Sequence, residues 1–236
     1  MERSIPLPPL TQRSVWLQAL PIVFGYLPVA IAFGILANKA GISTANTLAM
    51  SLLVYAGSAQ LISVTLIAAG ISPWSIILTT FVVNLRHLLM SAALSPYVHS
   101  WQTSRLAVFA FELTDETFAL HSTRFPLSEP QPHEVLSINV IAQSAWVFGT
   151  WVGVVAGGLI TDVKPFGLDY ALLAMFIALL ILQIKDRRTV AVAVLGGLLS
   201  TALLMAGVSQ WNVIIAALIA ATFGVFINTW TKPQSS

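Results

Sequence analysis

The stretch VLSINVIAQSAWVFGTWVGVVAGGLI, residues 135–160, contains no charged side chain. About 20 consecutive apolar residues suffice for a helix to cross the hydrocarbon core of a bilayer, so this run predicts a transmembrane helix. Similar runs recur along nearly the whole chain, in which 57% of the 236 residues are hydrophobic and 8% are charged. A soluble domain carries about 25% charged residues. The sequence therefore predicts an all-α fold, a polytopic helical integral membrane protein in the lipid bilayer.

Apolar windows of about 20 residues define eight candidate transmembrane helices, some of which we expect to be kinked or broken. They cover residues 15–38, 46–69, 74–95, 104–121, 135–160, 168–184, 188–207 and 211–230. The fourth window is interrupted by acidic residues, so the count falls to seven if it does not span; we prefer eight. The distribution of Lys and Arg does not separate seven from eight, nor settle the side of the N-terminus. Both topologies place the C-terminus in the cytoplasm.

The chain is expected to form a single transmembrane domain, residues 15–231, between polar tails at residues 1–14 and 232–236. The apolar run that follows the first tail is too long for the core of a signal peptide. We therefore expect an uncleaved first helix.

Several classes of function are disfavoured by what the sequence lacks. There is no cysteine, which excludes disulfides, thiolate metal sites and cysteine nucleophiles. No histidine pair has metal-ligand spacing, and the chain contains neither a GxxxxGK[ST] phosphate loop nor a GxSxG elbow. The net charge is only +2, and the basic residues stand mostly at the ends of apolar runs. We expect no metal, no cofactor and no nucleic-acid partner.

Two clusters of polar and charged residues interrupt the apolar runs, Asn84-Leu85-Arg86-His87 and Glu112-Leu113-Thr114-Asp115-Glu116. Each ionised side chain at the centre of a spanning helix costs about 2.5–3.5 kcal/mol, so these groups must pair, face a wet cavity or titrate. On one continuous helix the three carboxylates would share a face. Either Arg86 compensates them or at least one binds and releases a proton near neutral pH. The alternative is a surface helix or re-entrant turn with a solvated acidic face.

Four polar side chains at helical spacing on the third candidate helix predict a stripe that faces substrate: Thr80, Asn84, His87 and Ser91. Arg86 lies about 100° away around the helix, where it can pair with a charge. Because histidine titrates near neutral pH, His87 is a candidate proton relay or gate, and a hydrogen-bonded structural role is the alternative. His121 stands near a helix end, on the face opposite Glu112, and is predicted at the membrane interface.

Two segments favour broken or closely packed helices. Pro21 and Pro28 predict a break or kink in the first helix, and residues 55–60, YAGSAQ, predict a similar feature in the second. Exposed helix ends at a break can hold a small substrate, whereas kinks and small-residue packing alone are the alternative. A polar and then small stripe on the fifth helix indicates a pocket lining or a tight helix contact: Asn139, Gln143, Trp146, Thr150, Gly153 and Gly157.

Taken in order, four motifs resemble the AzlC family of branched-chain amino acid permeases. They are Pro21-Ile22-Val23 leading to Tyr26-Leu27-Pro28-Val29-Ala30 and Phe33-Gly34, then residues 55–60, then Leu85-Arg86-His87, then residues 113–119, LTDETFA. The resemblance covers residues 15–160, and the C-terminal third fits by hydropathy alone. Where relatives often have an acidic residue just before the Arg-His pair, this chain has Asn84-Leu85, which puts a local carboxylate partner for Arg86 in doubt.

The resemblance implies the large subunit of a bacterial inner-membrane exporter for branched-chain and similar amino acids. It further implies a small AzlD-type membrane subunit as partner and the proton gradient as driving force. The motif positions carried over are Pro28, Tyr55, Gly57, Gln60, Arg86, His87, Thr114, Asp115 and Glu116. With Tyr26, Asn84 and Glu112 added from the residue patterns, they form the predicted site for substrate binding or proton transfer.

Three hypotheses follow from these residues. In the transporter, the substrate carboxylate meets Arg86 or the broken first helix, its ammonium group meets Asp115 or Glu116, and a proton moves through His87 and the acidic cluster. Aliphatic selectivity would come from aromatic residues, namely Phe24, Tyr26 and Trp146. The second hypothesis is an intramembrane enzyme that uses His87 with an acidic partner for acid/base chemistry. The third is a channel or structural subunit in which the ion pairs only hold helices together.

Overall fold

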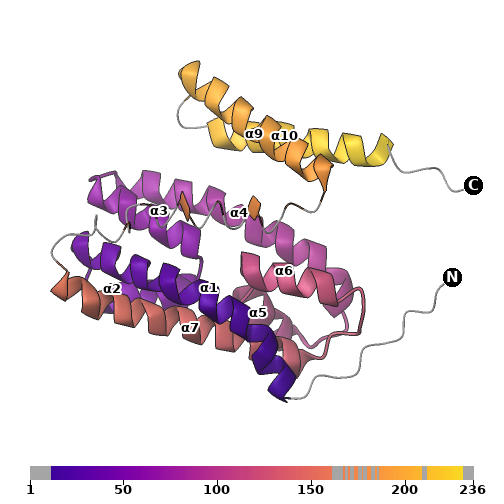
Figure 1. Ribbon diagram of the computed structural model, residues 1–236, viewed down its shortest axis with the longest axis horizontal. Coiled ribbons are helices and arrows are strands. Elements are labelled where there is room, and N and C mark those ends of the chain that lie inside the picture. The colour runs from indigo at the N-terminus through magenta and orange to yellow at the C-terminus, as the bar shows by residue number, and fades with distance from the viewer. Residues whose placement is uncertain are drawn as a thin grey trace, which may run out of the picture. The chain divides into compact units, whose positions relative to one another are not determined.

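The computed structural model (Figure 1) describes residues 12–160, 186–208 and 212–230, and single positions between them at 167, 170, 173, 174, 177, 180, 181 and 184. The helices of the first unit are α1 (Gln12–Lys39), α2 (Thr44–Ala49), the π-helix η1 (Met50–Val54), α3 (Gly57–Ala68), α4 (Pro73–Val98), α5 (Thr103–Phe111), α6 (Asp115–Arg124) and α7 (Pro132–Leu159). The second unit contains α9 (Arg187–Met205) and α10 (Asn212–Trp230). No strand occurs in the described residues, and the predicted all-α fold is confirmed.

Four of the described helices are long and apolar enough to cross a membrane, namely α1, α4, α7 and α9. Shorter apolar helices occur at Thr44–Val54, Gly57–Ala68 and Ile215–Ile227. These helices confirm a polytopic helical membrane protein. The candidate helix at residues 168–184 lies mostly outside the described residues. By its internal contacts the chain divides into two compact units, residues 1–177 and 178–236, and each is described by itself.

In the first unit, α1 and α7 lie side by side (Figure 1) and approach each other through small residues. A Cβ atom built on Gly153 would overlap the carbonyl oxygen of Ile31, and one built on Gly34 would overlap backbone atoms at residues 150–154. A Cβ on Gly149 would lie 2.8 Å from the Cβ of Ala30. Helices in lipid associate by such close packing, because lipid chains are as apolar as the side chains. The small part of the predicted α7 stripe is therefore a tight helix contact.

Two apolar clusters surround this pair of helices. The first joins α1, the end of η1 and α7 through Val15, Ala19, Ile22, Tyr26, Ala30, Tyr55, Ile138, Ala142 and Trp146. The second joins α4 to the α5–α6 segment and the start of α7 through Met90, Leu94, Val98, Phe109, Leu113, Phe125 and Val135. Together they hold the interrupted segments against long, uninterrupted helices.

The break predicted in the first helix is wrong, because α1 runs without interruption through Pro21 and Pro28. Proline is tolerated in membrane helices when neighbouring groups satisfy the freed carbonyls, and α7 packs along this helix. The interruption predicted at residues 55–60 of the second candidate helix is confirmed, since Tyr55 takes a left-handed conformation with φ 45° between η1 and α3. Residues other than glycine rarely adopt this backbone conformation, which turns the chain out of the helix.

The fourth candidate helix is also interrupted, since α5 ends at Phe111 and α6 begins at Asp115. The prediction that Glu112 shares a helical face with Asp115 and Glu116 is therefore wrong. The Thr114 hydroxyl accepts a hydrogen bond from the Thr117 backbone N–H, and the Thr117 hydroxyl accepts one from Thr114. This reciprocal capping starts a new helix. The two acidic residues in its first turn also favour a start there, since they face the positive end of the helix dipole.

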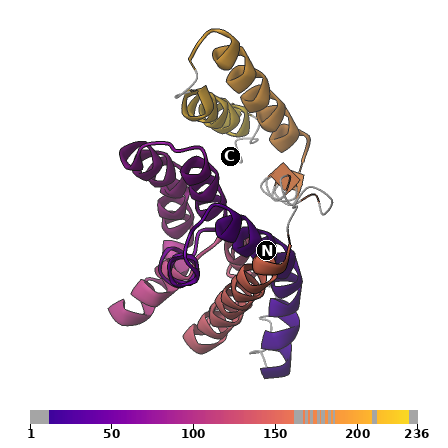
Figure 2. The same ribbon diagram turned by 90° about the vertical axis from the view of Figure 1, so that its left-hand side faces the viewer.

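In the second unit, α9 and α10 pack against each other (Figure 2). A Cβ on Gly224 would lie 3.1 Å from Val192, so the two helices are in close contact. Asp186 caps α9 by accepting a hydrogen bond from the backbone N–H of Thr189 at 2.7 Å. That bond, with a second from the Thr189 hydroxyl, holds the pKa of Asp186 below its usual range.

Candidate functional site

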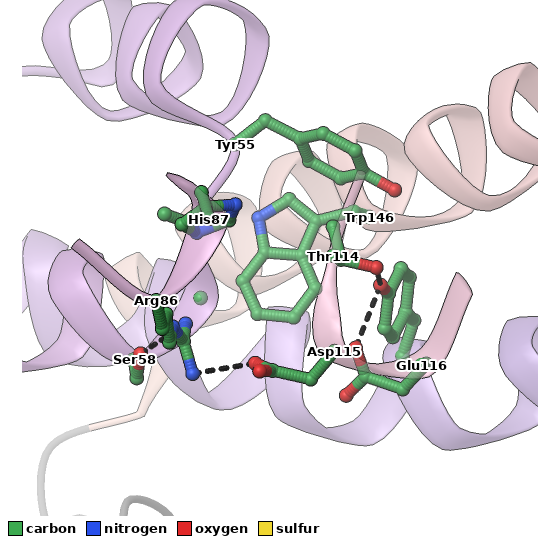
Figure 3. A pocket seen from close by; sticks show the side chains of 11 residues that line it. Tyr55, Ser58, Arg86, His87, Thr114, Asp115, Glu116 and Trp146 are labelled. Carbon is green, nitrogen blue, oxygen red and sulfur yellow. Dashed lines mark hydrogen bonds and ion pairs between the residues drawn. The ribbon is translucent and has the colours of Figure 1, made fainter. Parts of the chain in front are cut away.

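The two helix breaks meet at one pocket in the first unit (Figure 3). Its lining comes from α1, α4, α7 and both breaks: Tyr26, Tyr55, Ala56, Gly57, Ser58, Arg86, His87, Thr114, Asp115, Glu116 and Trp146. The cavity measures about 20 Å³, enough for roughly one water molecule. Charged and polar groups therefore converge on a small, partly open space among apolar helices.

Arg86 joins three elements at this pocket (Figure 3). Its Nη1 lies 2.5 Å from Oδ2 of Asp115 at the start of α6, and its Nη2 donates a hydrogen bond of 2.5 Å to Oγ of Ser58 in α3. Both charged side chains are mostly buried, at 24% and 15% exposed. The charge pairing expected of Arg86 is thus present, with a partner from a distant part of the sequence that makes up for the missing acidic residue beside it.

His87 contacts the break between α5 and α6. Its Nδ1 lies 2.8 Å from the carbonyl oxygen of Leu113, and because a carbonyl only accepts, Nδ1 carries the hydrogen. In a neutral ring Nε2 is then the atom with the lone pair. It is buried and has no hydrogen-bond partner in the described part of the chain. His87 therefore offers a free acceptor beside the pocket.

Glu116 is held by a chain of hydroxyl groups. The Tyr26 hydroxyl donates to Oε2 of Glu116 at 2.9 Å and lies 2.5 Å from Oγ1 of Thr114. A hydroxyl has one hydrogen, so Tyr26 accepts from Thr114 while it donates to Glu116. This places a carboxylate with a defined donor at the pocket wall.

The two sides of the pocket differ in charge. The first turn of α3 contains no acidic residue, and its unpaired N–H groups, with Arg86 beside them, form a positive side. Asp115 and Glu116, in the first turn of α6, form a negative side. In the described residues, no three His, Asp or Glu side chains are grouped as ligands for a metal ion. The arrangement suits a small molecule that carries both charges.

The aromatic wall of the pocket is held by a closed hydrogen-bond network. The Trp146 indole donates to Oε1 of Gln60 at 3.1 Å, and Nε2 of Gln60 donates to Oγ of Ser51 at 3.1 Å. Ser51 bonds to Thr150 at 2.8 Å, and Thr150 donates to the carbonyl oxygen of Trp146 at 2.9 Å. Because all four residues are buried, Gln60 acts here through the position of Trp146.

Replacing Gln60 by Leu is expected to lower the thermal unfolding temperature of the detergent-solubilised protein. The change leaves the buried Trp146 N–H without its acceptor and removes one of the two bonds of Ser51, and an unpaired buried polar group costs about 1–3 kcal/mol. Gln102→Leu is the control, since Gln102 is exposed and makes no capping hydrogen bond. Equal unfolding temperatures for the two variants would contradict this role of Gln60.

The pocket brings together most of the predicted site residues. Eight line it: Tyr26, Tyr55, Gly57, Arg86, His87, Thr114, Asp115 and Glu116. Four do not: Pro28, Gln60, Asn84 and Glu112. Ser58 was missed as a site residue, although it stands inside the YAGSAQ motif next to Gly57. His121, predicted at the membrane interface, is 0% exposed within the protein and bonded to Asn139 of α7.

Comparisons with known proteins place this site in context. The family model described as AzlC protein matches residues 21–160, which contain every residue of the pocket. The chain is 32% identical to the inner membrane protein YgaZ of Escherichia coli K12, over 87% of this chain and 84% of the relative. It is 34% identical to an uncharacterized membrane protein of Archaeoglobus fulgidus, over 85% and 88%. It is 26% identical to the branched-chain amino acid transport protein AzlC of Bacillus subtilis 168, over 88% and 81%. No solved structure matches the chain.

Proposed function

Because this chain belongs to the AzlC family, we propose that it is a secondary transporter that exports branched-chain and similar aliphatic amino acids. We place it in the bacterial inner membrane with its C-terminus in the cytoplasm, working with a small AzlD-type subunit and coupled to the proton gradient. The name of the Bacillus subtilis relative, a branched-chain amino acid transport protein, supports the substrate class. That of the Escherichia coli relative supports the inner membrane.

The opposed charges of the pocket are the observation that carries this proposal. An amino acid is a zwitterion, and a carboxylate is favoured beside Arg86 and the α3 N-terminus. Its ammonium group is favoured beside Asp115 and Glu116. Trp146 and the two tyrosines of the lining provide apolar surface for an aliphatic side chain.

Binding must rearrange the pocket, because a cavity of about 20 Å³ does not hold an amino acid. Arg86 closes it by bridging Ser58 and Asp115. We propose that the substrate carboxylate takes the place of Asp115 on Arg86, which frees Asp115 for the ammonium group. The bound substrate would then make contacts in an open pocket that are absent from the closed pocket. A ligand shifts a conformational equilibrium only through such a difference in contacts.

The geometry of the pocket gives less support to two other functions. An acid/base enzyme would pair His87 with Asp115 or Glu116, yet His87 bonds the Leu113 carbonyl and Asp115 bonds Arg86. A structural or channel subunit would use the Arg86–Asp115 pair only to join helices, and exchanging the two charges tests this.

The proposal is tested by counterflow of labelled leucine in proteoliposomes that contain this protein, with and without its small partner and with and without a pH gradient. We expect counterflow in the presence of the partner and accumulation against a concentration gradient only when the pH gradient is imposed. Absence of leucine movement under every condition, with protein that elutes as a single folded species, would contradict the proposed substrate class.

A further inference from the structure

A second line of buried polar side chains runs away from the pocket along the contact of α6 with α7. On α6 its members recur at i, i+3, i+7 and i+10, on one helical face: Thr114, Thr117, His121 and Arg124. On α7, Glu134 forms an ion pair of 3.8 Å with Arg124, and Asn139 bonds His121. The partner residue number on α7 increases from 134 to 139 as the residue number on α6 decreases from 124 to 121, so the two helices run antiparallel here. The line therefore leads from the 125–131 loop to the pocket.

His121 and Asn139 form the centre of this line. Both are 0% exposed, and Nε2 of His121 lies 2.8 Å from Oδ1 of Asn139, so Nε2 donates. The ring stacks on Phe125 at a centroid distance of 5.1 Å and also contacts Phe109. Nδ1 of His121 and Nδ2 of Asn139 have no hydrogen-bond partner among the described residues.

These two orphan atoms distinguish the pair from a structural one. A buried polar group without a partner costs about 1–3 kcal/mol, and nearly all such groups in proteins are satisfied. A pair retained only to hold α6 against α7 has no reason to leave two. A role in accepting and releasing a proton gives the Nδ1 atom of His121 such a reason.

Hydroxyl groups connect the Thr117 end of the line to the pocket. Oγ1 of Thr117 lies 3.2 Å from Oγ1 of Thr114, which in turn lies 2.5 Å from the Tyr26 hydroxyl. Thr117 can donate its hydrogen to this oxygen or to the Thr114 carbonyl at 3.3 Å. With the first choice, Thr117 donates to Thr114, Thr114 to Tyr26 and Tyr26 to Glu116. All three hydroxyls then point the same way, toward the carboxylate.

We propose that His121 carries the coupled proton between the Arg124–Glu134 end of this line and Glu116 in the pocket. His121 accepts a proton on Nδ1 and becomes an imidazolium, then releases it toward Thr117. That residue lies one helical turn away, about 5–6 Å between Cβ atoms, a gap short enough for one water molecule to bridge. Each hydroxyl passes on its own hydrogen, and Glu116 becomes a neutral carboxylic acid, so one proton moves and no other bond changes.

The ionisable groups on the elements packed around the pair influence how readily His121 accepts a proton. On α5 and its end, on α6 and at the start of α7 they are Arg105, Glu112, Asp115, Glu116, Arg124, His133 and Glu134. Arg124 opposes a charge on His121, and Glu134, paired with Arg124, offsets that effect. Neutralisation of Glu116 also links this path to the substrate, because Glu116 is one of the carboxylates proposed to hold the ammonium group.

This inference rests on the proposed function, so its test measures two activities in the same proteoliposomes. Leucine counterflow requires binding and exchange but no net proton movement, whereas accumulation driven by a pH gradient requires coupling. In His121→Gln we expect counterflow within about twofold of wild type and gradient-driven accumulation reduced at least about tenfold. His99→Gln is the control, since His99 is exposed at the end of α4 and bonds only the Pro96 carbonyl.

The outcomes separate the two proposals. Wild-type protein without counterflow overturns the proposed function. Wild-type counterflow with undiminished accumulation in His121→Gln overturns the role of His121 alone, as does an equal loss of both activities, which a structural role would give. Should His121→Gln fail to fold, Thr117→Ser and Thr117→Val decide: the serine, which keeps the hydroxyl, should retain coupling and the valine should lose it. Equal coupling in both overturns the path.

Discussion

Gly153→Val is expected to abolish accumulation of folded protein in the membrane. A Cβ at this position would overlap the carbonyl oxygen of Ile31 in α1, and its other near neighbours there are also backbone atoms. Backbone atoms cannot move aside as a flexible side chain can, so α1 and α7 must separate. Because the pocket is built on these two helices, we expect a loss of stability above about 4 kcal/mol, the range of core overpacking at its most severe.

The control for this substitution lies on the same helix. Gly158→Val adds the same side chain where a Cβ would meet no atom within 4 Å, and it changes helix propensity in the same way. The yield of monodisperse protein on size-exclusion chromatography, with the thermal unfolding temperature, measures the difference. Comparable yields and unfolding temperatures for the two variants would show that the α1–α7 contact is less tight than described.

Arg86→Ala and Asp115→Ala are each expected to reduce leucine transport at least about 100-fold while folded protein remains in the membrane. Removing one partner of the ion pair leaves the other charge without its counter-ion at the pocket. Under the proposed function each substitution also removes a group that binds substrate. Arg105→Ala is the matched control, because Arg105 is exposed on α5. Near-normal transport by Asp115→Ala would remove Asp115 from the mechanism.

The double variant Arg86→Asp with Asp115→Arg separates binding from a structural role. The exchanged pair can still join α4 to α6, so a purely structural pair predicts recovery of stability and transport together. The transporter proposal predicts recovery of stability alone, since the positive group is displaced from Ser58 and the α3 N-terminus. Counterflow of labelled leucine beside thermal unfolding of the same preparation distinguishes the two.

Long apolar runs were sufficient to predict α1, α4, α7, α9 and α10, each found within a few residues of its expected ends. A run longer than the bilayer is thick has no stable conformation in lipid except a helix, because its backbone must satisfy its own hydrogen bonds. The same reasoning predicted that Arg86 can compensate the acidic cluster. These results follow from composition and local spacing alone.

Which of the expected interruptions forms a break could not be read in this way. Prolines predicted a break or kink in α1, yet this helix is continuous, whereas the interruption expected at residues 55–60 is present, with Tyr55 in a left-handed conformation. Similarly, residues 104–121 read as one helix until Thr114 is seen to cap a second. Whether a helix is interrupted at a given residue depends on the neighbouring groups that satisfy or replace its backbone hydrogen bonds, and these groups are distant in sequence.

The sequence by itself determined that this is an all-α membrane protein of the AzlC family and which polar residues its helices must accommodate. Only the tertiary structure decided how those residues are grouped: Arg86 with Asp115 and Ser58, Gln60 with Trp146, and His121 with Asn139. The physical reason is that the cost of burying a polar group is a local property of the chain. The partner that offsets this cost is supplied by packing, which brings together residues separated by 18 to 86 positions.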